Sequence, residues 1–231
     1  MKVEIWSDIA CPFCYIGKRH FEMALKQLPF SDSVEVEWKS FELDPYAQNE
    51  YEDDLYTLLA NKYGQSREWA INSAEHMRQR GQEVGLTFNF DQTKSTNTFK
   101  AHRLIHLAKS KGLQNEAEEA LFEAYFKDCM HLYKDEVLIE VGKKIGLIEE
   151  DVRKMLSSDM YKEEVRSDEL ESQQLGIRAV PYFVIERKYG ISGAQPIEHF
   201  VQVLTKVHKD LVEIAVENDG SDNSCSVEGC D

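Results

Sequence analysis

Short β-prone stretches stand near both ends of the chain, and a long segment with helical periodicity separates them. Residues 3–6 are β-prone, and residues 34–41 alternate apolar and polar side chains with the period of two that is typical of a half-covered sheet. Residues 180–185 regain β character, and residues 189–193 follow a turn as a short partner strand. The pattern therefore predicts two β-rich ends that complete one sheet.

Residues 51–174 have the periodicity of amphipathic helices. Ala101, Leu104, Ile105 and Ala108 have the i, i+3, i+4, i+7 spacing of a single helix face, and Ser66 is a good N-cap for an earlier helix. The remaining helices are predicted at 116–127, 135–145, 149–156 and 161–175, and a last one begins near 196.

This order of elements predicts an α/β, thioredoxin-like fold with a large all-helical insertion domain. Neither β-rich end could cover its sheet alone, so residues 1–46 and 176–212 together make the thioredoxin-like domain. Residues 47–175 make the helical insertion. Residues 213–231 are predicted to be an acidic, cysteine-containing tail.

The composition of the chain limits which kinds of partner it can bind. The chain has 27 Lys and Arg against 42 Asp and Glu, a net charge of −15, which argues against nucleic acid or an anionic membrane. The N-terminus lacks the apolar region of a secretory signal, and no stretch approaches the ~18 apolar residues of a membrane-spanning helix. We therefore expect a cytoplasmic protein, where a Cys-x-x-Cys motif is more often catalytic or metal-binding than structural.

Cys11-Pro12-Phe13-Cys14 stands where the first strand meets a helix. The first sulfur would lie at the helix N-terminus, where free N–H groups and the positive end of the helix dipole stabilise a thiolate. The second lies one turn on, on the same face, and can close a disulfide with the first. Pro12 suits the first helical turn and would leave Cys11 at an exposed edge, with Cys14 better shielded. We predict that Cys11 attacks through a mixed disulfide and that Cys14 resolves it, with no bound metal.

A second cysteine pair, Cys225 and Cys230, lies in the predicted tail. Together with Cys11 and Cys14 it leaves a four-thiolate zinc site open as a minor alternative, although the spacing is loose for zinc. We favour a second redox pair that exchanges with the first, and an inert pair of exposed thiols remains open.

Val180-Pro181 is the other chemical signal. A proline that opens a strand is usually trans, but a thioredoxin-like fold places a cis proline against the active-site sulfur at this point of the chain. We therefore predict a cis Val180–Pro181 bond, with the Val180 backbone exposed to an extended substrate. His102 and His106 have metal-ligand spacing on one helix face, but we expect a solvated or core-edge pair.

Four blocks of sequence resemble the DsbA-like thioredoxin-fold oxidoreductases, and specifically the cytosolic FrnE-like subgroup. They are residues 7–17, 97–104, 176–184 and 191–196. The resemblance implies thiol–disulfide oxidoreductase or isomerase activity, with Cys11 attacking and Cys14 resolving. It also implies a cis bond before Pro181 and a helical lid over a substrate groove, to which Pro12, Phe13 and Val180 contribute. Some relatives carry a second pair such as Cys225 and Cys230.

Two other functions remain open. Kappa-class glutathione transferases and 2-hydroxychromene-2-carboxylate isomerases have a similar architecture, but they place a serine where this chain has Cys11. A holdase-like binding module is the third alternative, because an apolar groove is expected under the lid. The expected partners are protein thiols and disulfides or small disulfides, with glutathione as a candidate reductant or co-substrate and no other cofactor. The chain could be a monomer or a homodimer.

Overall fold

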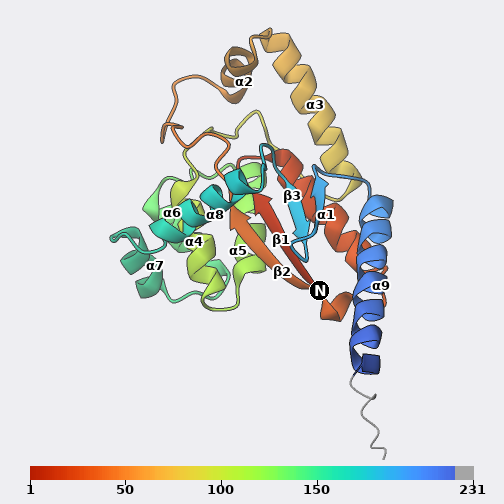
Figure 1. The fold of residues 1–231 in the computed structure, drawn as a ribbon. Coiled ribbons are helices and arrows are strands. Elements are labelled where there is room, and N and C mark those ends of the chain that lie inside the picture. Colours follow the sequence, from red (N-terminus) through yellow and green to blue (C-terminus); the bar gives the residue numbers. More distant parts are fainter. Residues whose placement is uncertain (222–231) are drawn as a thin grey trace, which may run out of the picture.

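The computed structural model describes the backbone of residues 1–221 and the side chains of residues 1–213. Its sheet has the strand order β2-β1-β3-β4 (Figure 1). Strand β1 (Lys2–Ser7) pairs in parallel with β2 (Glu35–Ser40) and antiparallel with β3 (Tyr182–Ile185), which pairs antiparallel with β4 (Tyr189–Ser192). The two β-rich ends of the sequence therefore form one sheet, as predicted.

Helices cover both faces of this sheet. On one face, α1 (Pro12–Leu25) and α9 (Ile197–Ser221) pack on β3, with ring centroids 5.5 Å apart for Phe21 and Phe183 and 4.7 Å apart for Phe183 and Phe200. Neighbouring residues of a strand point to opposite faces. Trp6 of β1 lies opposite Tyr182, the neighbour of Phe183, and therefore points to the other face of the sheet. There its indole N–H donates to the Asp168 carbonyl of α8 (Lys162–Gln174) at 2.9 Å. Strand β1 is therefore buried on both sides.

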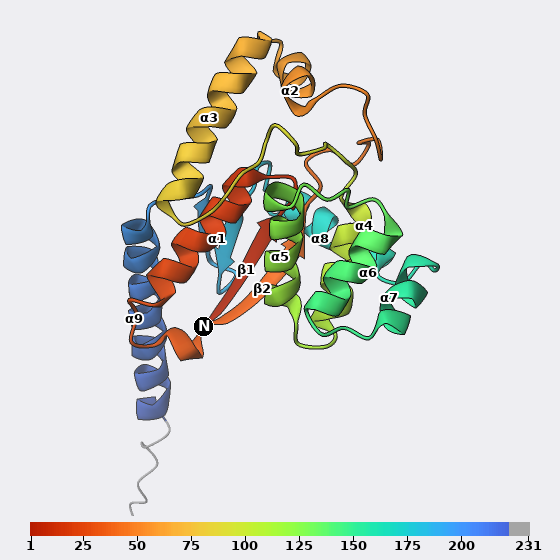
Figure 2. The same cartoon turned by 180° about the vertical axis from the view of Figure 1, so that it is seen from behind.

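The helical insertion lies between β2 and β3 in the chain. Helices α2 (Leu55–Tyr63) and α3 (Arg67–Glu83) form an arm that projects beyond the end of the sheet (Figures 1 and 2). The predicted N-cap of α3 is confirmed, since the Ser66 hydroxyl accepts the Trp69 backbone N–H at 3.1 Å. The other elements are η1 (Ser31–Ser33), α4 (Phe99–Lys109), α5 (Gln114–Phe122), the π-helical η2 (Glu123–Lys127), α6 (Asp135–Lys144) and α7 (Glu149–Leu156).

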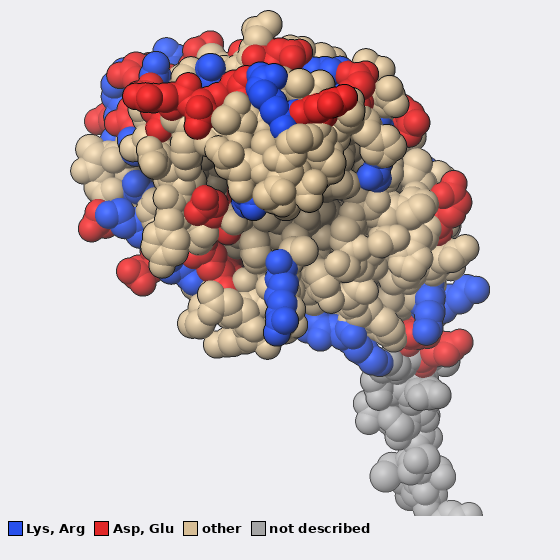
Figure 3. Space-filling view, turned by 90° about the horizontal axis from the view of Figure 1, so that it is seen from above, with Lys and Arg blue, Asp and Glu red and all other residues tan. Residues whose placement is uncertain are grey.

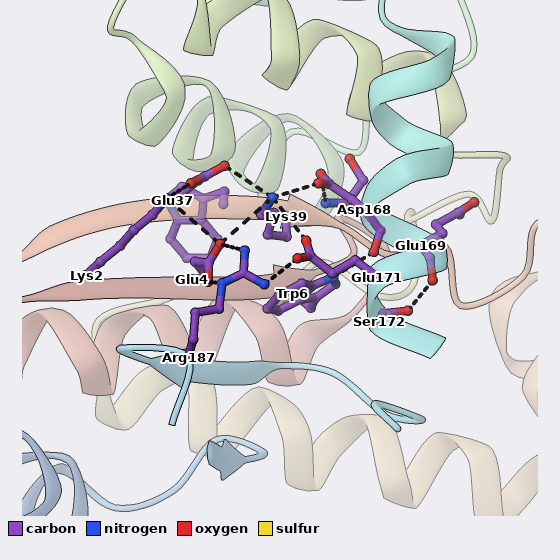
Figure 4. A network of polar contacts seen from close by, with 12 residues as sticks. Lys2, Glu4, Trp6, Glu37, Lys39, Asp168, Glu169, Glu171, Ser172 and Arg187 are labelled. Atoms are coloured by element: carbon purple, nitrogen blue, oxygen red, sulfur yellow. Dashed lines mark hydrogen bonds and ion pairs between the residues drawn. The ribbon is translucent and has the colours of Figure 1, made fainter. Parts of the chain in front are cut away.

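A network of buried charges joins α8 to the sheet (Figure 4). The ammonium of Lys39 lies 3.0 Å from Asp168 and 3.3 Å from Glu37. Buried Glu4 faces Arg187, which also pairs with Glu171 of α8. Burial would raise the pKa of Glu37, but the lysines around it lower that pKa to about 2. Most charges of the network face an opposite charge and none of them lies at the cysteines, so we assign the network to stability.

The C-terminal helix is longer than the sequence indicated. Helix α9 continues to Ser221, within the segment expected to be a tail, while Cys225 and Cys230 lie outside the described residues. No helix among the described residues is both long and apolar enough to cross a membrane.

Candidate active site

Cys11 is the N-cap of α1, in extended backbone conformation (φ −98°, ψ 110°), and Pro12 is the first helical residue. The backbone N–H of Cys11 donates to the Asp8 carbonyl at 3.0 Å, which fixes the turn from β1 into the helix. No acidic residue stands in the first turn of α1. The first sulfur of the motif is thus held at the positive end of a helix, as predicted.

Cys11 is less exposed than the sequence indicated. We expected an exposed edge, but only 5% of its surface is accessible, because the segment that precedes β3 lies over it. The Cys11 sulfur is 3.7 Å from the Val180 carbonyl oxygen. The Val180–Pro181 bond is cis, as predicted. The Val180 backbone therefore covers one side of the Cys11 sulfur.

Gly17 allows this close approach of α1 to Pro181. A Cβ atom at position 17 would lie 2.8 Å from Cγ of Pro181 and 3.5 Å from Cα of Ala194, and both neighbours belong to constrained segments. The glycine is therefore required by packing, and it sets the distance between α1 and the segment that faces Cys11.

Cys14 is buried more deeply, with 1% of its surface accessible. Its sulfur is surrounded by the Cys11 sulfur, the Ser7 hydroxyl and the Asp8 backbone N–H. Burial raises the pKa of the Cys14 thiol well above its ordinary value, and the adjacent Cys11 adds to the rise. Both cysteines are unoxidised. The pair is therefore asymmetric, with one sulfur at the helix end and the other kept protonated beneath it.

Ionisable groups from the insertion lie behind Cys14. His102 of α4 is buried, with its Nε2 3.5 Å from an Asp8 carboxylate oxygen. Asp8 also accepts the Leu43 N–H at 2.7 Å and the Ala10 N–H at 3.2 Å. Burial acts against both charges, yet the Asp8 carboxylate raises the pKa of His102, and the His102 ring and the two N–H groups lower that of Asp8.

The carboxylate of Glu118, from α5, also lies close to Cys14. The Ser7 hydroxyl donates to its carboxylate at 2.7 Å, and the same hydroxyl lies beside the Cys14 sulfur. Burial raises the pKa of Glu118 to about 7, although the Ser7 hydrogen bond and the charge on His102 oppose the rise. The insertion thus supplies a titratable carboxyl one side chain away from the second cysteine.

Phe13, between the two cysteines, is 41% exposed, and the Arg80 guanidinium of α3 lies over its ring at 5.4 Å. Figure 3 looks at the molecule from above, the side on which the arm of α2 and α3 lies in Figure 1. It shows a broad hollowed surface without Lys, Arg, Asp or Glu, bordered by charged side chains.

The structure brings the predicted residues Cys11, Pro12, Phe13 and Cys14 together with Val180 and Pro181. Asp8, Glu118 and Arg80 were not expected at this site. His102 and His106 were expected to be solvated or at the core edge, but both are buried because each faces a buried aspartate; His106 lies 3.1 Å from Asp168.

Comparison with known proteins places this geometry in context. A model of the DSBA-like thioredoxin domain family matches residues 2–205. The crystal structure of a probable DsbA oxidoreductase from Streptomyces coelicolor is 39% identical and has a TM-score of 0.87, over 100% of this chain and 94% of that one. The uncharacterised protein YwbO of Bacillus subtilis (strain 168) is 26% identical over 186 residues, which are 79% of this chain and 86% of YwbO.

Two more distant structures share the fold. The cytosolic disulfide reductase DsbM of Pseudomonas aeruginosa has a TM-score of 0.64 at 14% identity, over 90% of this chain and 99% of that one. A 2-hydroxychromene-2-carboxylate isomerase also has a TM-score of 0.64, at 12% identity, over 95% of this chain and 98% of that one. At such identities the likeness concerns the fold alone. The predicted thioredoxin-like α/β fold is confirmed.

Proposed function

This chain belongs to the DSBA-like thioredoxin domain family, and from that premise we propose that it is a thiol–disulfide oxidoreductase with Cys11 and Cys14 as its redox pair. One observation carries the proposal. Two unoxidised cysteines meet at the start of α1, and the sulfur of the first faces the Val180 carbonyl. Burial disfavours a thiolate at Cys14, so the two sulfurs stand in different environments.

In the reductive direction, the Cys11 thiolate attacks one sulfur of a substrate disulfide. A bond forms between these two sulfurs, and the other substrate sulfur leaves as a thiolate that takes a proton from water. Cys14 then gives its proton to water, and its thiolate attacks the Cys11 sulfur. The Cys11–Cys14 disulfide forms, the second substrate sulfur is released, and two electrons have passed from the protein to the substrate. The oxidative direction reverses these steps.

The segment at Val180 and Pro181 is suited to hold the substrate chain. An extended peptide beside the Val180 backbone would place its own cysteine next to the Cys11 sulfur, since that carbonyl is 3.7 Å from the sulfur. Phe13 and Pro12 would then contact the substrate from the α1 side. We propose these four residues as the substrate-binding part of the site.

We further propose protein thiols and disulfides or small disulfides as substrates, disulfide isomerisation among the activities, and the cytoplasm as the compartment. DsbM, described as a cytosolic disulfide reductase, has been solved with GSH, and a DsbA of Proteus mirabilis with a bound peptide. These structures support the choice of substrate class. The blocks at 7–17 and 97–104 support the FrnE-like subgroup.

Reduction of insulin by dithiothreitol, followed by turbidity, tests the proposal. The parent protein should accelerate precipitation, and Cys11→Ser should fall to the uncatalysed rate. Cys14→Ser should be impaired as well, because it can attack but cannot resolve. Cys129→Ser is the matched control, since this cysteine lies in the insertion, where its sulfur contacts Thr93, and should change little. Equal catalysis by Cys11→Ser and the parent would refute the proposal.

A further inference from the structure

Two arginines near Cys11 have no counter-charge. Arg80 and Arg178 form neither an ion pair nor a side-chain hydrogen bond within the part of the chain whose side chains are described. Arg103 donates to backbone carbonyls. Each of the others pairs with a carboxylate: Arg19, Arg67, Arg78, Arg153, Arg166 and Arg187. The chain has a net charge of −15, yet neither arginine has a carboxylate partner among the described side chains.

Arg80 lies beside the redox pair, and Arg178 belongs to the segment before β3 that faces Cys11. Arg80, from α3, lies over the exposed ring of Phe13, two residues after Cys11. Arg178 is exposed and lies two residues before Val180, whose carbonyl oxygen is 3.7 Å from the Cys11 sulfur. A guanidinium that lies over an aromatic ring is held in place by the ring but keeps N–H groups for a ligand.

The residues around the Cys11 sulfur do not offset the positive charge of Arg80 and Arg178. The first turn of α1 has no acidic residue, and the helix dipole places its positive end there. The nearest carboxylate in the sequence, Asp8, is buried and directed at His102 and two backbone N–H groups. Arg80 and the positive end of α1 therefore add positive charge near Cys11 on a protein with a net charge of −15.

We propose that Arg80 and Arg178 select small disulfides that carry carboxylates, glutathione disulfide among them. The inference rests on the proposed function, because the selected molecule is the substrate of Cys11. A planar guanidinium binds a carboxylate through two parallel hydrogen bonds, so each arginine can hold one carboxylate while Cys11 attacks the disulfide. The exchange is the one described above, and the thiol that leaves carries its carboxylate away.

Two chromogenic disulfides separate charge recognition from reactivity. Dithiobis(2-nitrobenzoate) carries two carboxylates, and 4,4′-dithiodipyridine carries none. The second-order rate constant of the reduced protein is measured with each reagent by stopped flow, for the parent, Arg80→Gln, Arg178→Gln and the double variant. Arg80→Lys retains the charge without the planar fork. Lys188→Gln is the matched control, since Lys188 lies 5.4 Å over the ring of Tyr189, at the other end of β3, and forms no ion pair with a described side chain.

We expect Arg80→Gln to react about tenfold more slowly with the dicarboxylate, as loss of a charge-assisted hydrogen bond implies, and within about twofold of the parent with dithiodipyridine. Arg178→Gln should act in the same direction, Arg80→Lys should lie between, and Lys188→Gln should match the parent. Added salt should lower the rate constant of the parent for the dicarboxylate relative to that of the double variant.

Two outcomes count against different claims. An unchanged ratio of the two rate constants in the double variant would overturn the selection by Arg80 and Arg178 while leaving Cys11 as the nucleophile. If the parent reacts with dithiodipyridine no faster than Cys11→Ser does, the proposed function itself fails. The same comparison is then repeated with two small disulfides of opposite charge. The turnover of glutathione disulfide, which is anionic, is measured beside that of cystamine, which is cationic.

Discussion

The carbonyl oxygen of Val180 lies 3.7 Å from the sulfur of Cys11, although 169 residues separate them in the chain. The whole helical insertion lies between these two residues in the sequence. The sheet brings them together because β1 and β3 pair directly, with Trp6 opposite Tyr182. The site is therefore assembled by the strand pairing, and the distance between α1 and the Pro181 segment sets its geometry.

Gly17→Ala tests that distance. The added Cβ would lie 2.8 Å from Cγ of Pro181, so α1 must move away from the segment that faces Cys11. We expect a loss of about 1–3 kcal/mol in the free energy of unfolding and a clear loss of insulin reduction. Gly142→Ala is the matched control, because its Cβ would lie 2.8 Å from Cγ2 of Val152, inside the insertion. It should lose stability but keep its activity, and equal activity in the two variants would show that the spacing is unimportant.

Glu118 gives a prediction about pH and stability. Burial raises the pKa of Glu118 from the ordinary 4.5 to about 7, so the folded protein binds this proton more tightly than the unfolded chain does. The unfavourable contribution of Glu118 is absent below pH 4.5, grows as the pH rises, and is complete above about 7. Glu118→Gln should therefore be close to the parent in stability at pH 5 and more stable by roughly 3 kcal/mol at pH 8.

Urea unfolding of both proteins at the two pH values measures this difference. Glu116→Gln, exposed on the same helix, is the control and should give the same small change at both pH values. A Glu118→Gln effect that is independent of pH would contradict the shifted titration.

The charge network of Figure 4 should contribute to stability and not to catalysis. Asp168 accepts the Ser40 backbone N–H at 2.9 Å and pairs with Lys39 at 3.0 Å. Asp168→Asn leaves the partly buried Lys39 with less compensation, and we expect the free energy of unfolding to fall by about 3 kcal/mol. Insulin reduction per folded molecule should stay at the parental rate. Loss of activity at full stability would mean that the network reaches the active site.

Part of this site could be predicted from the sequence because the signals are local. Cys11 and Cys14 stand at a strand-to-helix junction, and Pro181 opens a strand after a long insertion, which is enough to place the three residues together. Glu118 could also have been found. It lies three and four residues before Leu121 and Phe122, on the apolar face of its helix, whereas the adjacent Glu119 has only Phe122 at such a spacing.

Other parts depend on tertiary contacts that no local pattern encodes. Arg80 reads as one of several polar residues near the end of α3, and only the docking of that helix beside α1 places it over Phe13. His102 looks like a surface histidine until α4 packs behind the loop that carries Asp8. The continuation of α9 to Ser221 likewise contradicts a composition that favours a tail.

Trapping of the mixed disulfide is the most direct test of the central proposal. Reduced Cys14→Ser protein is mixed with glutathione disulfide, digested and mapped by mass spectrometry, beside the parent protein. We predict glutathione attached to Cys11 in the variant and a Cys11–Cys14 disulfide without glutathione in the parent. Glutathione attached mainly to another cysteine such as Cys129, or a parent protein in which Cys11 and Cys14 remain unlinked, would contradict the proposed redox pair.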